Sequence, residues 1–297
     1  MASSGLTPPS RELATERHGA GGVNWLPILF FGALLLLLFA PVIVGMAKEW
    51  SSDDDMGHGF FVPVVAGWVA WQKRDELSKI PVKTNNWGFL FLLWGGFQLF
   101  AGTLGVELFV ARTAFLISLV GVILTVWGVA ALRTLAFPLF LLAFMIRIPA
   151  IIFTQITFPL QLFASSVAET VLSLVGIPVF REGNILELPS QRLSVVEACS
   201  GIRSLLSLTF LSLVYGYVFE RKNWLRIVLF FATVPIAIAA NAFRVALTGI
   251  LSEYKRELAE GFFHAAEGWV IFMIALMILV LLHQALNKVY ELAYGKR

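Results

Sequence analysis

Residues 195–205, with the sequence Val-Val-Glu-Ala-Cys-Ser-Gly-Ile-Arg-Ser-Leu, stand between a polar loop and an apolar run that continues to Phe219. Cys199 in this stretch is the one cysteine of the chain. The run from Ala198 to Phe219 is long enough to cross a bilayer, because a spanning helix needs about 20 apolar residues. The stretch therefore predicts a thiol at the mouth of a membrane helix.

The composition places the whole chain in the membrane class. Hydrophobic residues make up 58% and charged residues 14% of its 297 residues, and the mean hydropathy is +0.82. Soluble proteins carry about 25% charged residues. One cysteine excludes an intrachain disulfide, and zinc-type Cys/His spacing is absent from the sequence. We therefore expect no metal and no cofactor, and the lack of a basic, aromatic-interleaved surface argues against nucleic acid as a partner.

We predict an all-α integral membrane protein with about eight transmembrane helices plus an outer-face amphipathic or re-entrant helix. Residues 1–24 are expected to form a disordered cytoplasmic tail, and residues 25–297 a single polytopic membrane domain. The expected spans cover residues 25–47, 59–71, 87–105, 108–132, 134–148, 198–219, 227–247 and 264–286.

Residues 150–175 differ from the spans because polar side chains recur there at steps of three or four. This polar stripe consists of Thr154, Thr157, Gln161, Ser165, Glu169 and Ser173. It predicts a helix that lies along the outer interface, or dips into the membrane and returns. The loop of residues 177–196 follows, and its residues 179–180 and 185–188 are expected to pair as a short hairpin.

The distribution of Lys and Arg indicates the orientation, since cytoplasmic loops are enriched in them. If the amino terminus is inside, most Lys and Arg residues outside the spans fall on the inner side. Both termini are then cytoplasmic, and Cys199, Arg244 and His264 all lie at outer helix ends. A thiol, a guanidinium and an imidazole at one level are the set needed for acyl transfer through a thioester. The guanidinium would stabilise an oxyanion or hold the substrate carbonyl.

Each of these residues also has a structural interpretation. Cys199 can be a small apolar residue of a membrane helix, and Arg244 can extend its side chain to the outer headgroups. His264 can be an interfacial histidine. Arg203, one turn from Cys199, can pair with Glu197 or Glu169, and His58 lies at the outer edge after an aspartate run.

Five motifs, in this order along the chain, resemble the exosortase/archaeosortase family. They are residues 57–63 (GHGFFVP), residues 176–179 (GIPV) with 181–184 (REGN), residues 197–203 (EACSGIR), Pro235 followed by residues 241–245 (NAFRV), and His264 before Gly268. The similarity extends from about Trp50 to Phe272.

The resemblance implies a multi-pass cysteine transpeptidase of the bacterial inner membrane whose active site faces the periplasm. Such enzymes process membrane-anchored proteins that end in a short PEP-type motif, a spanning helix and a basic tail, and transfer them to an acceptor. By position, Cys199 matches the nucleophile, Arg244 the family's arginine, and His264 the histidine of the bacterial branch. We expect no extra soluble domain after the last span. Supporting or substrate-binding candidates are Glu197, Arg203, Asn241, His58 and Glu169.

Two other functions remain open from the sequence. A membrane cysteine protease would hydrolyse the same thioester with water, and product mass would separate it from a transpeptidase. A transporter or channel would line its path with Arg244, Glu169 and Arg203, but the polar residues gather at one surface and no inverted repeat is evident, whereas transporter sites lie near the midplane. The oligomeric state is not predicted.

Overall fold

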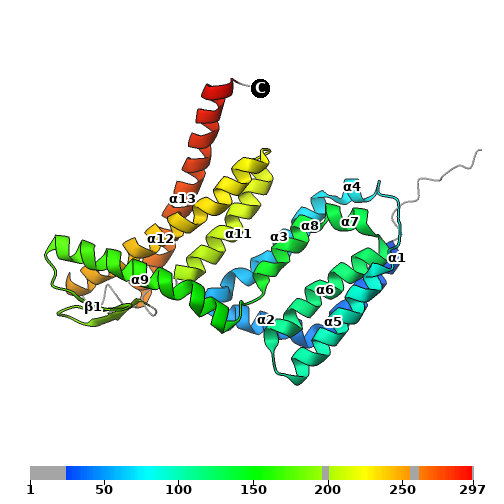
Figure 1. Cartoon of the computed structure of the whole chain (residues 1–297), viewed down its shortest axis with the longest axis horizontal. Helices are drawn as coiled ribbons and strands as arrows, with labels where there is room; N and C mark the ends of the chain where they lie inside the picture. Colours follow the sequence, from blue (N-terminus) through cyan, green and yellow to red (C-terminus); the bar gives the residue numbers. More distant parts are fainter. Residues whose placement is uncertain (1–24, 196–200, 255–260, 296–297) are drawn as a thin grey trace, which may run out of the picture.

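The fold was described from a computed structural model, which describes residues 25–195, 201–254 and 261–295. Helices of the first half pack as one group and those of the second half as another, with three short strands at one end (Figure 1). The first group contains α1 (Trp25–Leu38), α2 (Ala40–Ser52), η1 (Asp54–Phe60), α3 (Phe61–Gln72), α4 (Arg74–Leu77), α5 (Trp87–Leu104), α6 (Leu108–Val126), α7 (Val129–Thr134), α8 (Ala136–Leu141) and η2 (Leu142–Met145). The second contains α9 (Ala150–Val175), β1 (Phe180–Glu182), β2 (Ile185–Glu187), β3 (Arg192–Ser194), α11 (Gly201–Phe219), α12 (Asn223–Tyr254) and α13 (Gly261–Tyr294).

The all-α membrane class is confirmed, but the count of eight spans is not. Within the described ranges, five helices are long and apolar enough to cross a bilayer, or six if the bent pair α1–α2 forms one span. The five are α5, α6, α9, α12 and α13. The predicted spans at residues 59–71 and 134–148 correspond to helices that are shorter than this criterion. The predicted span at residues 198–219 corresponds to α11, which is described as a helix of 19 residues from Gly201.

Proline and glycine explain two of the departures from the predicted spans. The first predicted span bends by 68° between α1 and α2. Pro41 occupies the first turn of α2, where its ring cannot fit a continuous helix. The fourth predicted span, residues 108–132, ends as a helix at Val126. Gly128 follows with φ 84° and lies against the Lys83 carbonyl, where a side chain would clash.

The two longest helices extend beyond their predicted ends. We expected residues 248–263 to form a polar loop, but α12 continues to Tyr254. Thr248, Gly249 and Ser252 are buried there, and the Leu172 side chain of α9 packs against Gly249. Small and polar residues are typical of loops, so the sequence predicted a loop here. Their burial against another helix is a tertiary contact that the local sequence does not indicate.

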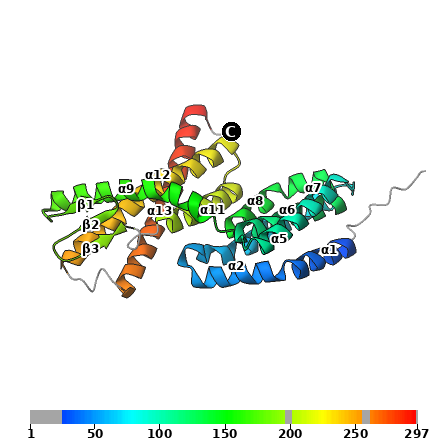
Figure 2. The ribbon, with the colours of Figure 1, turned by 60° about the horizontal axis from the view of Figure 1, so that its bottom comes forward.

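The polar stripe of α9 contacts the sheet. Asn184 donates to Gln161 at 3.1 Å, Ser165 donates to the Gly183 carbonyl at 2.9 Å, and Arg181 pairs with Glu169 at 2.6 Å. The stripe is thus partnered by the loop that follows it. Figure 2 shows the strands beside α9, at the end of the molecule where α12 ends.

The predicted hairpin is present and gains a third strand that the sequence did not reveal. The order is β1-β2-β3, both pairs are antiparallel, and Phe180 lies opposite Glu187. Gly183, at φ 64°, takes the first position of a two-residue turn that requires a positive φ. Leu186, Leu188, Leu193 and Val195 are buried against α9 and against Ala242, Val245 and Ala246 of α12.

A carboxylate shared by two arginines holds the first group together. Glu49 of α2 pairs with the buried Arg112 of α6 at 2.7 Å and with Arg147 at 3.4 Å, while Arg147 also pairs with Asp53. Aromatic contacts then join the two groups, since Phe144 contacts Phe210 and Phe137 stacks on Tyr217 with centroids 4.2 Å apart. Helix α11 is therefore the element that connects the halves.

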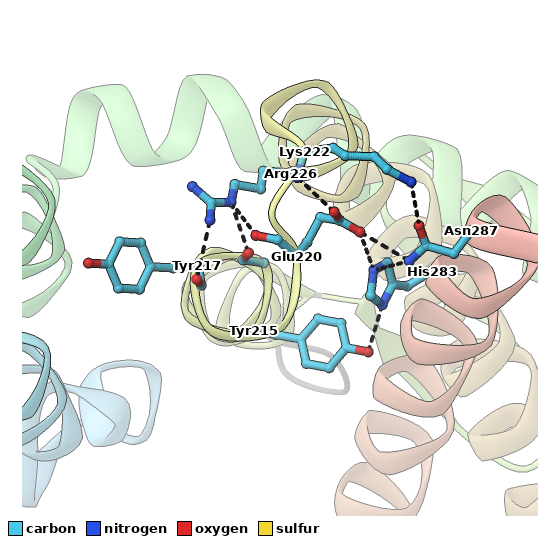
Figure 3. A network of polar contacts seen from close by, with 8 residues as sticks. Tyr215, Tyr217, Glu220, Lys222, Arg226, His283 and Asn287 are labelled. Atoms are coloured by element: carbon cyan, nitrogen blue, oxygen red, sulfur yellow. Dashed lines mark hydrogen bonds and ion pairs between the residues drawn. The ribbon is translucent and has the colours of Figure 1, made fainter. Parts of the chain in front are cut away.

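A second polar network joins α11, α12 and α13 at the end where α11 runs into α12 (Figure 3). The buried Glu220 accepts hydrogen bonds from the Lys222 backbone at 2.7 Å and from Asn287 at 3.0 Å, and lies 2.9 Å from His283 Nε2. Nδ1 of His283 lies 2.8 Å from the Tyr215 hydroxyl. Burial alone would raise the pKa of the Glu220 carboxyl, but these hydrogen bonds together lower that pKa to about 2.

We expect Glu220→Gln to lower the free energy of unfolding at neutral pH by about 1–3 kcal/mol, because the network loses its charged acceptor. A depressed carboxyl pKa stabilises the fold above the ordinary value of 4.5, and that contribution disappears as the pH falls toward about 2. The difference between wild type and variant should therefore shrink from pH 5 downward. Thermal unfolding in detergent at several pH values measures it, and a difference of constant size across that range would contradict the role given to Glu220.

Candidate active site where three helices meet

Helices α11, α12 and α13 pack around a small apolar core. Leu208 of α11, Leu229 and Ala237 of α12, and Ala275 and Leu279 of α13 are all buried in it. Alanines at these positions allow the helix backbones to approach closely, as small residues do at helix interfaces in membranes. The core ends in a pocket.

The pocket lies where the three helices come together, and most of its lining is small or apolar. Arg244 supplies its positive charge and Asn241 its amide, and both project from α12. The lining residues are Ser204, Leu208, Ala237, Ala240, Asn241, Arg244, Gly268, Ile271, Phe272 and Ala275.

The guanidinium of Arg244 lies directly against the backbone of Gly268 in α13. A Cβ atom added at Gly268 would be 2.9 Å from Nη2 and 3.0 Å from Cζ of Arg244. Any side chain at residue 268 would therefore displace the guanidinium. Gly268 is a positioning element for the cation, which explains why a glycine stands inside a long helix despite its low helix propensity.

His264 precedes Gly268 by four residues on α13, so the two positions share a face of that helix. The described part of α13 begins at Gly261, so the backbone of His264 lies within its first described turn. The backbone thus places the His264 position one turn from the contact between Gly268 and Arg244. The side chain of His264 lies outside the described residues.

The described part of α11 reaches the pocket. It begins at Gly201, and Ser204, three residues later, lines the pocket. The guanidinium of Arg244 makes the pocket favourable for a negative group such as a thiolate or an oxyanion.

Several predicted residues cannot be placed. Cys199 and Glu197 lie outside the described residues, as does the side chain of Arg203, whose backbone belongs to α11. Of the predicted set, the structure brings Arg244 and Asn241 together in the pocket and places the His264 backbone beside them.

Two other predicted residues lie away from the pocket lining. His58 belongs to η1, and its Nε2 lies 3.2 Å from the Phe144 carbonyl. Burial lowers the pKa of its imidazole, so it is uncharged at neutral pH. Glu169 faces the sheet and pairs with Arg181, so it fixes β1 on α9.

The pocket also contains residues that the sequence analysis did not select. Ser204, Ala237, Ala240 and Phe272 are examples. Their signal was the spacing, since residues 237, 240, 241 and 244, and residues 268, 271, 272 and 275, recur at steps of three and four. In the part of the chain that the structure describes, no three His, Cys, Asp or Glu side chains gather as a metal site.

Comparison with protein families identifies the family to which the chain belongs. The transmembrane exosortase family matches residues 50–281, which is well over half of the chain. A search of curated proteins and a search of solved structures each gave no significant match. The match covers α3 to most of α13, including the pocket and the Arg244–Gly268 contact. The chain is therefore a multi-pass membrane protein that belongs to the transmembrane exosortase family.

Proposed function

We propose that the protein is a cysteine transpeptidase that cleaves PEP-type carboxy-terminal sorting signals at the outer face of the bacterial inner membrane. The observation that carries this proposal is the Arg244 guanidinium held against Gly268 in a pocket that Ser204 of α11 also lines. Cys199 precedes Ser204 by only five positions in the sequence. In this proposal the thiol comes within reach of the Arg244 cation, which would favour its reaction as thiolate.

The reaction that we propose has two half-reactions. The Cys199 sulfur attacks the scissile carbonyl carbon while His264 takes the thiol proton, and Arg244 stabilises the resulting oxyanion. The C–N bond then breaks, His264 returns the proton to the leaving amine, and a thioester remains on Cys199. An acceptor nucleophile next attacks the thioester and releases the protein on the acceptor. Water in place of the acceptor would give hydrolysis.

In the proposed orientation, the Glu220 network lies at the cytoplasmic side of the membrane and the pocket lies at the outer side. Lys222 and Arg226 flank that network, and Lys222 lies over the Tyr290 ring at 3.6 Å. Lys and Arg favour the cytoplasmic side, and Tyr is common at both membrane interfaces. A substrate helix running with its basic tail inward would then present its outer segment to the pocket. Membrane-anchored substrate proteins and the lipid bilayer are the partners in this proposal.

A co-expression experiment tests the proposal. A periplasmic reporter ending in a Pro-Glu-Pro motif, a spanning helix and a basic tail should be shortened by the wild type and not by Cys199→Ala. A hydroxylamine-sensitive adduct between enzyme and reporter would identify the thioester. Equal processing by both forms would remove Cys199 from the mechanism, and the mass of the product separates transfer from hydrolysis. A transporter or channel, by contrast, should tolerate the Cys199→Ala substitution.

Gly268→Ala should reduce processing at least about tenfold while the fold remains stable. The added methyl group displaces only the end of a flexible side chain, and alanine is favoured over glycine in a helix by about 1 kcal/mol. The matched control is Gly96→Ala in α5, where an added Cβ meets nothing within 4 Å. Processing rates and thermal unfolding of both variants measure the effect, and wild-type processing by Gly268→Ala would show that the contact does not position Arg244 for the reaction.

A further inference from the structure

Among the residues that the structure describes, β3 is an edge strand with no further strand beside it, and the backbone groups along this free edge point away from the sheet. Hydrogen-bonded and non-bonded residue pairs alternate along an antiparallel ladder. The Val195 N–H donates to Asn184, and the Leu188 N–H donates to the Gln191 carbonyl, both at 2.9 Å. Arg192 and Ser194 therefore fall at the alternate positions of the register, where N–H and C=O are directed away from β2.

This edge belongs to a strand that packs on the helix carrying Arg244. Leu193 and Val195, on the opposite face from Arg192, are buried in one cluster with Ala242, Val245 and Ala246 of α12. The Ser190 N–H donates to the Glu253 carboxylate of the same helix at 2.9 Å. Beyond Val195, five residues lead to the described start of α11. An extended peptide on this edge would thus lie on a strand that is packed on α12 and is close in the chain to α11.

Arg192 has a guanidinium that can be shared with a ligand. Its side chain is 65% exposed and lies 2.8 Å from the Glu187 carboxylate and 3.8 Å from the Glu182 carboxylate, which are 41% and 71% exposed. Exposed pairs of this kind contribute little free energy, so an incoming carboxylate can compete for the arginine. Arg181, on the other edge strand, is held by Glu169 and by the Gly183 carbonyl.

We propose that the free edge of β3 binds the PEP-type motif as a fourth, antiparallel strand, with the motif's glutamate opposite Arg192. This inference rests on the proposed function for the identity of the substrate. Directly opposed residues project to the same face, so the glutamate carboxylate meets the Arg192 guanidinium as a cross-strand ion pair. The glutamate also exchanges both backbone hydrogen bonds with Arg192.

The alternation of proline in the motif fits an edge strand. In Pro-Glu-Pro the glutamate uses its N–H and C=O toward β3, while both prolines occupy the alternate positions that face away. Proline has no N–H, so it is accommodated at such outward positions and would block a further strand. The antiparallel polarity directs the residues before the motif toward Ser194 and the amino end of α11. The edge therefore selects an extended, acidic, proline-flanked segment.

A charge exchange tests the side-chain part of the proposal. Arg192→Glu should lower the initial rate of processing of a Pro-Glu-Pro reporter at least about tenfold, because an attractive cross-strand pair becomes repulsive. The same variant should process a Pro-Lys-Pro reporter faster than the wild type does. Glu187→Gln, which removes the nearer of the two competing carboxylates, should process the Pro-Glu-Pro reporter as well as the wild type or better. Wild-type rates for Arg192→Glu with both reporters would overturn the proposal.

A second pair of variants tests the backbone part. Ser194→Pro removes an outward N–H but no hydrogen bond to β2, so the sheet should persist while processing falls severalfold. Ser194→Ala is the matched control and should process normally. A photo-crosslinker at residue 194 of the Cys199→Ala protein should also attach to reporter residues preceding the motif. Equal processing by both Ser194 variants, or crosslinks confined to the reporter's spanning helix, would contradict edge binding.

The two levels of proposal fail separately. If the wild type and Cys199→Ala leave the reporter equally unprocessed or equally processed, the proposed function fails. If wild-type processing depends on Cys199 but is indifferent to the Arg192 and Ser194 changes, the transpeptidase proposal stands and the edge is not the recognition site.

Discussion

The close approach of α12 and α13 at Gly268 is the constraint on which the candidate site depends. A guanidinium rests where a side chain would otherwise stand, so the position of Arg244 is determined by the backbone of a neighbouring helix. The small residues around it, such as Ala237 and Ala275, bring the helices near enough for this contact. At the other end, Glu220 ties the loop between α11 and α12 to His283 and Asn287 of α13. The bundle is thus joined by close packing of Arg244 on Gly268 at one end and by polar contacts at the other.

The sequence was most informative where its patterns reflect a local physical demand. Long apolar runs predicted α5 closely and the first residue of α6, and the three-four spacing predicted the whole of α9. The turn at Gly183 and Asn184 predicted the hairpin. Arg244 stood out because an ionisable residue inside an apolar run needs a partner or a cavity, and it does line a pocket.

The failures have a common cause, which is that tertiary contacts override local composition. The extension of α12 through Thr248 and Ser252 depends on burial against α9, and the short third strand depends on pairing with β2. The role of Gly268 is invisible without the partner that packs on it. The sequence could not predict the ion pairs of Glu49 either, because its two partners, Arg112 and Arg147, are far from it along the chain.

The length of α12 has a consequence for where chemistry takes place. At a rise of about 1.5 Å per residue, the stretch from Asn223 to Arg244 is about 32 Å long, which matches the roughly 30 Å thickness of the hydrocarbon layer. With Asn223 at one boundary of that layer, Arg244 reaches the other, and the remaining turns to Tyr254 stand about 15 Å beyond it. The sheet that packs on those turns is then lifted among headgroups and water. Glu253 and Arg192 can keep their charges there without the cost of entering lipid, and the guanidinium of Arg244 lies at the boundary between hydrocarbon and water.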